Sequence, residues 1–162
     1  MQSEHLEKII ISTGLGRLRQ RQGFKEALLP EVIKALTEIT GQKPAETIAR
    51  KSIAGFKLRA GDVIGLKVTL RGKRKDKFLK KLVEVTLPRI RDFRGIDPKQ
   101  IDEQGNLTIG IREHIVFPEI NPDEVKSDFG LEVTLVSNVK DREMSYEFFK
   151  SLGVPLKGLE EK

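Results

Sequence analysis

The chain contains no cysteine and no tryptophan, and it holds only one tyrosine and two histidines. Without cysteine there are no disulfides, no thiolate metal sites and no cysteine nucleophile, which suits a reducing compartment. No apolar run approaches the ~20 residues that span a bilayer, and the first residues lack the apolar stretch of a signal peptide. We therefore expect a cytoplasmic protein without a membrane partner.

Catalytic motifs are also missing. Gly14 and Gly16 follow a predicted strand, but the third glycine of a dinucleotide-binding turn would fall at Arg19. The histidines His5 and His114 lack metal-ligand spacing, and a structural or solvent-facing role for His114 is favoured over catalysis. The residues do not assemble a nucleophile, a base and an oxyanion site. We expect neither an enzyme nor a protein that binds a cofactor or a metal.

Positive charge is concentrated in the middle of the chain. Residues 41–94 hold 16 Lys and Arg against 5 Asp and Glu, a net charge of +11, whereas the whole chain carries +6. The other residues together therefore carry −5. This asymmetry favours a polyanionic partner, with nucleic acid ahead of membrane. The alternative is a lysine-rich surface that meets only solvent.

Hydrophobic periodicity predicts one domain over residues 1–162, with elements in the order β, α, β, β, α, β, β, α. Most predicted strands alternate apolar and polar residues, which is typical of a sheet covered on one face. The predicted fold class is therefore α+β, an antiparallel sheet with helices packed on one face and the other face free to bind RNA. Met144 is expected on the apolar side of the last helix. The predicted strands span 7–13, 45–49, 62–72, 106–117 and 130–136, and the predicted helices span 28–40, 75–86 and 141–152.

The predicted strand 62–72 indicates what the free face offers. Its apolar residues alternate with Lys67, Thr69 and Arg71, which can all donate hydrogen bonds to phosphate or ribose. A flat cationic face suits structured RNA, whose shallow groove displays phosphates and 2′-hydroxyl groups. The sequence shows no recognition helix, zinc finger or basic zipper for DNA, and it has few aromatic residues for stacking on single strands.

Two segments are predicted to be loops. The first, "RKSIAGFKLRAGD" over residues 50–62, surrounds Ile53 and Phe56 with basic residues. Its residues alone leave two interpretations open: a β-hairpin tip whose apolar side chains fold back on the core, or a loop that touches RNA. The second, residues 94–106, has glycine, proline and charge without a regular period, so we expect a flexible loop.

Three stretches of the chain carry a resemblance to a known family. They are "GQKPAETIARKSIAGFKLRAGDVIGLKVTLRG" (41–72), "LPRIRDFRGI" (87–96) and "GNLTIGIREHIVFPEI" (105–120). In this order they resemble bacterial large-subunit ribosomal protein five, of the universal ribosomal protein family that binds 5S rRNA. The resemblance extends from "KIIISTGLG" to "LGVPLK", which is nearly the whole chain.

The resemblance implies a structural protein of the central protuberance of the large ribosomal subunit, located in the ribosomes of the cytoplasm. Its partners would be 5S rRNA, 23S rRNA, neighbouring protuberance proteins, peptidyl-site tRNA and, across an intersubunit bridge among the later loops, small-subunit ribosomal protein thirteen. Carried onto this sequence, the 5S rRNA contact would comprise Ser12, Thr13, Gly14, Gly16, Gln42, Lys43, Lys67, Thr69 and Arg71. The loop that reaches tRNA would comprise Arg50, Lys51, Ser52, Gly55, Phe56, Lys57 and Arg59.

The chain also departs from the family pattern. Ser12 and Thr13 stand where the family usually has Asn-Met, so a hydrogen bond from Ser12 to RNA would have a shorter reach. Members usually have a further helix ahead of the first strand, which is predicted here to begin at residue 7; either the lineage lacks that helix or the gene start is misplaced. The alternative function is a free-standing RNA-binding regulator or RNA chaperone of the same fold.

Overall fold

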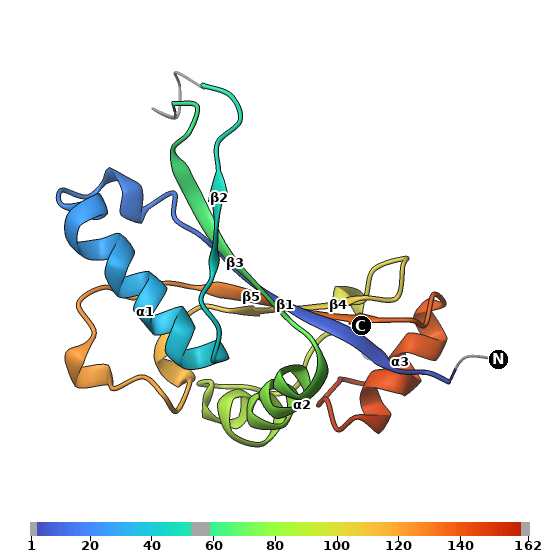
Figure 1. Cartoon of the computed structure of the whole chain (residues 1–162). Coiled ribbons are helices and arrows are strands. Elements are labelled where there is room, and N and C mark those ends of the chain that lie inside the picture. The colour runs from blue at the N-terminus through green and yellow to red at the C-terminus, as the bar shows by residue number, and fades with distance from the viewer. Residues whose placement is uncertain (1–2, 53–58, 160–162) are drawn as a thin grey trace.

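The protein folds around a five-stranded antiparallel sheet with the strand order β2-β3-β1-β5-β4. The computed structural model describes residues 3–52 and 59–159. Figure 1 shows the helices on one side of the sheet and a ribbon of β2 and β3 that extends beyond it. The predicted α+β class and the predicted order of elements are confirmed. The elements are β1 (Leu6–Gly14), α1 (Leu29–Thr40), β2 (Ala45–Ile48), β3 (Val63–Leu70), α2 (Gly72–Lys81), β4 (Leu107–Ile111), β5 (Leu131–Ser137) and α3 (Arg142–Ser151).

The central strand β1 shows why one face of the sheet is buried. Its side chains alternate between the two faces, so that Ile9 and Ile11 are fully buried while Ile10 between them is only half-buried. β1 pairs with β3 and β5, and this register places Val68 and Val133 level with Ile11. Apolar side chains therefore form continuous rows across the sheet, and these rows are the floor of the hydrophobic core.

Helix α1 covers this floor with the apolar stripe predicted for it. Val32 and Ile39 are buried, and Pro30 lies in the first turn, where its missing N–H is tolerated. A π-helical turn, Phe24–Leu28, precedes the helix. Gly41 ends it with a φ of 76°, a left-handed conformation that glycine adopts without strain. The helix end predicted at residue 40 is confirmed.

The strand predicted over 106–117 is wrong in its second half. β4 pairs with β5 only over Leu107–Ile111, because β5 begins at Leu131 and offers no partner farther along. Residues His114–Val116 form a 3₁₀ turn instead of continuing the strand. His114 in this turn and Phe117 after it are buried, while Ile115 and Val116 are half-buried. The sequence therefore keeps the appearance of a half-buried strand after the chain has left the sheet.

The other two helices differ from the prediction in detail. α2 begins at Gly72, three residues before the predicted start. The expectation for Met144 is wrong, because its side chain is 54% exposed. Met144 lies in the first turn of α3, where its N–H donates to the Asp141 carboxylate, and the buried side of the helix is formed by residues such as Tyr146 and Phe149. Within the described ranges, no helix is both long and apolar enough to cross a membrane.

The segment 94–106 makes contacts with other parts of the chain. Ile96 pairs with Leu156 near the C-terminal end in a parallel bridge, and Ile101 pairs with Leu107. The side chains of Ile96 and Ile101 are buried in the core. The flexibility expected of the segment stays a prediction.

Candidate nucleic-acid interface

The face of the sheet opposite the helices is the candidate interface, and we call it the open face. Strand pairing defines two rows of outward-pointing residues on it. The first row crosses β3, β1, β5 and β4 as Lys67, Ser12, Glu132 and Gly110. The second row crosses the same strands as Thr69, Ile10, Thr134 and Thr108. These two rows therefore carry four hydroxyl groups, one lysine, one carboxylate and the half-buried side chain of Ile10.

Three of the predicted RNA-contacting residues lie on β3 or directly after it. Lys67 and Arg71 are exposed, and Thr69 is half-buried. Lys67 lies level with Ser12 on the neighbouring strand, so a cation and a hydroxyl group occupy adjacent positions. Such a pair can bind the phosphate and the ribose of one RNA backbone.

The predicted corner at Gln42 and Lys43 is fixed by hydrogen bonds. The Gln42 side-chain amide donates to the backbone carbonyl of Thr69 over 3.1 Å, and its carbonyl accepts from the Arg74 guanidinium over 3.1 Å. Lys43 is exposed next to it. The corner thus joins the end of α1 to β3 and adds Arg74, which was not among the predicted contacts because it comes from the first turn of α2.

The residues predicted to contact RNA at the end of β1 and in the turn after it do not all lie on the open face. Thr13 is 5% exposed, and its hydroxyl donates to the Gly130 carbonyl over 2.6 Å. Its side chain points to the core side and is therefore not available to RNA, and its backbone lies opposite Leu66 in the ladder between β1 and β3. Leu15 is fully buried and anchors the turn, while Gly14 and Gly16 are exposed on either side of it.

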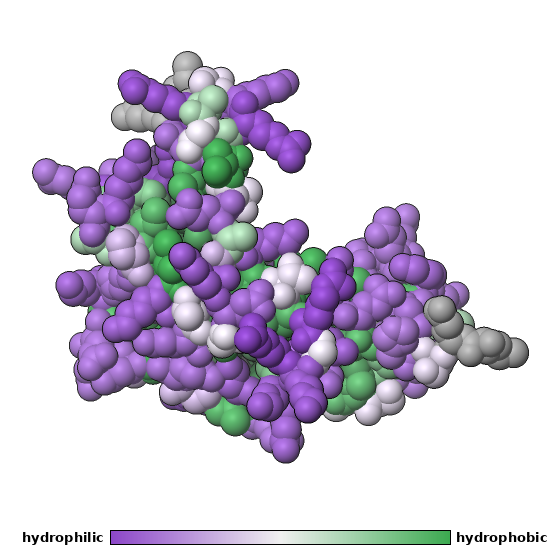
Figure 2. All heavy atoms as spheres, in the orientation of Figure 1, coloured by the Kyte–Doolittle hydropathy of each residue, from purple (hydrophilic) through white to green (hydrophobic). Residues whose placement is uncertain are grey.

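The segment predicted to reach tRNA continues the β2–β3 ribbon. The Gly61 N–H donates to the Ala49 carbonyl over 2.9 Å, and the Ala60 N–H donates to the Ser52 hydroxyl over 3.0 Å. Arg50, Lys51, Ser52 and Arg59 are exposed toward the outward end of this ribbon. In the space-filling view, hydrophilic side chains project from this end of the molecule (Figure 2). Ile53, Gly55, Phe56 and Lys57 lie outside the described residues.

An ion pair ties the base of the ribbon to the turn that follows β1. The Arg19 guanidinium lies 2.6 Å from the Asp62 carboxylate, which also accepts from the Arg59 N–H over 2.9 Å. The Arg59 N–H bond and, after it, the charge of Arg19 hold the pKa of Asp62 below its ordinary value. Asp62 thus holds the backbone of Arg59, whose side chain takes part in no ion pair among the described residues.

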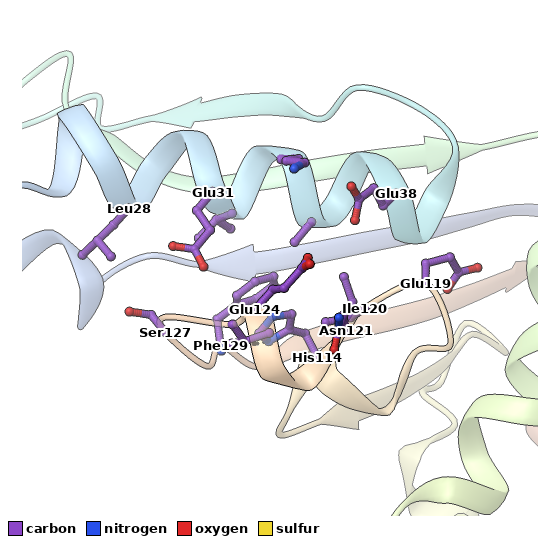
Figure 3. A pocket seen from close by; sticks show the side chains of 14 residues that line it. Leu28, Glu31, Glu38, His114, Glu119, Ile120, Asn121, Glu124, Ser127 and Phe129 are labelled. Atoms are coloured by element: carbon purple, nitrogen blue, oxygen red, sulfur yellow. Dashed lines mark hydrogen bonds between the residues drawn. The ribbon is translucent and has the colours of Figure 1, made fainter.

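A second surface, of opposite charge, lies on the helix side. A cleft of about 250 Å³ separates α1 from the segment 114–129, and Figure 3 shows acidic side chains from both walls. We call it the acidic cleft, because four carboxylates and one lysine line it: Glu31, Glu38, Glu119, Glu124 and Lys34.

His114 forms part of the wall of the acidic cleft. Its ring stacks on Phe129 with 4.0 Å between ring centroids, and its Nδ1 accepts from the Phe129 N–H over 3.3 Å. Burial lowers the pKa of His114, although Asp128 and Glu31 favour its charged form. The geometry is that of a structural histidine. In the described parts of the chain, no group of three or more metal-ligating side chains comes together.

Nearly the whole chain is similar to known proteins. Residues 1–59 match the family described as Ribosomal protein L5, and residues 63–156 match the model of the C-terminus of that same ribosomal family. The Large ribosomal subunit protein uL5 of Halothermothrix orenii is 51% identical over 150 residues, which covers 93% of this chain and 82% of the relative. The proteins of the same name from Leptospira biflexa and Heliobacterium modesticaldum are 44% and 46% identical, over 96% and 97% of this chain and 82% and 85% of each relative.

Proposed function

The chain belongs to the ribosomal protein L5 family, and on that premise we propose that it binds 5S rRNA through the open face of its sheet. It is an RNA-binding structural constituent of the large ribosomal subunit and not an enzyme. The open face can serve this role because no helix that the structure describes covers it and its polar side chains are accessible to RNA (Figure 1).

The observation that carries the proposal is the position of Lys67 beside Ser12. A lysine flanked by hydroxyl groups on a flat sheet matches the wide, shallow minor groove of A-form RNA, where phosphates and 2′-hydroxyl groups are accessible. The Gln42 corner extends the same surface at the edge of β3. Arg71 and Arg74 add positive charge there, and positive charge supplies most of the affinity for a nucleic-acid backbone.

The outward end of the β2–β3 ribbon is the proposed contact with peptidyl-site tRNA. Its described cations are Arg50, Lys51 and Arg59, all exposed. Because the ribbon extends beyond the sheet (Figure 1), one molecule can hold 5S rRNA on the open face and reach a second RNA with the ribbon. Shortening the ribbon between Ser52 and Ala60 should leave the affinity for 5S rRNA unchanged and weaken tRNA binding to the ribosome. The opposite result would assign the ribbon to 5S rRNA.

The acidic cleft is the proposed side of the bridge to small-subunit ribosomal protein thirteen. Glu119 is already paired with Lys81. The other three carboxylates, Glu31, Glu38 and Glu124, take part in no ion pair among the described residues, and they would repel an RNA backbone and attract a basic protein. It also lies on the helix side, which leaves the open face available for 5S rRNA. Contacts with 23S rRNA and with neighbouring protuberance proteins are expected on the surfaces that remain.

Binding measurements with the full chain test the central proposal. The affinity for 5S rRNA should exceed that for tRNA and for duplex DNA of equal length, and it should fall steeply as salt is added. Equal affinity for all three would refute the proposal. Cosedimentation separates it from a free-standing regulator or RNA chaperone, since a ribosomal constituent must be present in the large subunit in stoichiometric amount.

A further inference from the structure

A hollow of about 480 Å³ lies on the open face, where β1 and β4 end and β5 begins. The phosphate contacts proposed for β3 do not use it. Its lining includes Ser12, Gly14, Gly110, Arg112 and Glu132. This volume lies within the roughly 300–1,000 Å³ of pockets that hold a small molecule, so a single nucleotide can enter it.

The floor of the hollow is open because two strand positions lack side chains. A Cβ atom added at Gly14 or at Gly110 would meet nothing within 4 Å. Neither glycine has a positive φ, and the ladder between β4 and β5 runs through Gly110 without a bulge. Glycine weakens a strand, and the backbone here does not require it. A glycine in this setting often marks a place where another molecule comes close.

The walls of the hollow carry charges that the described residues do not neutralise. Glu132 and Arg112 are both exposed, and neither takes part in an ion pair within residues 3–52 and 59–159. Glu132 lies level with Ser12 on one side and Gly110 on the other. A carboxylate in this position accepts hydrogen bonds and repels phosphate.

We propose that the hollow receives one nucleotide of 5S rRNA and that Glu132 accepts a hydrogen bond from it. The donor is a group of the RNA minor groove, either a ribose 2′-hydroxyl or the N2 amino group of guanine. Phosphates then lie over Lys67 and near Arg112, and the donor edge lies over Glu132, which fixes the orientation of the RNA on the sheet. The inference rests on the proposed function and makes it more specific.

Because Glu132 is negatively charged, a substitution can distinguish a hydrogen bond to RNA from a purely electrostatic effect. RNA is a polyanion, so removing any exposed carboxylate should strengthen binding if the carboxylate acts only through charge. A Glu132→Gln variant should instead weaken 5S rRNA binding by about fivefold or more, because a charge-assisted hydrogen bond is replaced by a neutral one. Glu46→Gln is the matched control, since Glu46 is also exposed but lies level with Leu66 and so belongs to the other face.

Two outcomes separate this inference from the proposed function. If the unaltered chain fails to bind 5S rRNA, the proposed function is refuted together with the inference. If it binds and Glu132→Gln binds equally or more tightly, only the inference is refuted. Interference mapping on 5S rRNA carrying random 2′-deoxy or inosine substitutions identifies the donor, because its interference should appear with the unaltered chain and disappear with the variant.

A Gly110→Val variant tests the hollow independently of charge. Valine favours strands, and a Cβ atom at this position meets nothing within 4 Å, so the thermal midpoint should stay the same or rise. The affinity for 5S rRNA should fall about tenfold, since the side chain fills the space that the nucleotide needs. Unchanged affinity in a correctly folded Gly110→Val variant would show that RNA does not enter the hollow.

Discussion

Neutralising Lys67 and Arg71 together is the most direct test of the open face. The structure places both side chains in solvent, with no ion pair among the described residues. Each phosphate contact lowers the logarithm of the binding constant by about 0.9 per decade of salt. Losing two contacts should therefore reduce the salt slope by about 1.8. Between about 50 and 200 mM salt, the advantage of the unaltered chain over the double alanine variant should shrink about 12-fold.

Filter binding or fluorescence anisotropy with labelled 5S rRNA over a salt series measures both quantities. Lys34→Ala combined with Lys140→Ala is the matched control, since both lysines are exposed but neither lies on a strand: Lys34 is in α1 and Lys140 comes directly before the N-cap of α3. The control should change the slope little. The stability of the Lys67 and Arg71 variant should stay within about 0.5 kcal/mol of the unaltered chain. An unchanged slope would refute the phosphate contacts, and a large loss of stability would mean that these side chains support the core.

Three further predictions concern stability. Gly105→Ala should destabilise the fold by about 3 kcal/mol or more in urea unfolding, because Gly105 has a φ of +83° and a Cβ would lie 2.0 Å from the Val139 carbonyl oxygen; a loss under about 1 kcal/mol would contradict this geometry. The pKa of His114 is lowered by burial, so the unfolded chain binds the proton first and the free energy of unfolding should fall as the pH drops below about 6.5. His114→Gln should flatten this dependence between about pH 7.5 and 5.5, and an unchanged dependence would contradict the assignment to His114. Lys81→Met should cost about 1–3 kcal/mol, because the ammonium group bonds the carbonyl at the end of α1 and the Glu119 carboxylate; an unchanged urea midpoint would show that neither bond stabilises the fold.

Much of the fold could be predicted from local patterns. The alternation from residue 64 to residue 70 defined β3 and its two faces, and the apolar stripe of α1 with Gly41 after it defined that helix. These features depend only on neighbours in the sequence. The end of β4 depends on where its partner strand begins, and this cannot be seen in the sequence of β4 itself.

The candidate site was predictable only where it depends on neighbours in the sequence. The cationic positions on β3 followed from its alternation. β1 is a run of β-branched residues without polar alternation, so nothing local indicated that Thr13 faces the core side while Ser12 faces outward. The Gln42 and Arg74 contact joins two elements through space. Residue pairs of this kind appear only once the sheet and the helices are assembled.

The bond from Gln42 to the Thr69 carbonyl also has a consequence for the protein before it meets RNA. β3 continues beyond the residues that β2 can pair with, and an unpaired strand edge is a template for aggregation. The side-chain amide occupies an acceptor of that edge in place of a neighbouring strand. Edge-to-edge association of two free chains would therefore have to break this bond before a strand could pair with β3 at Thr69.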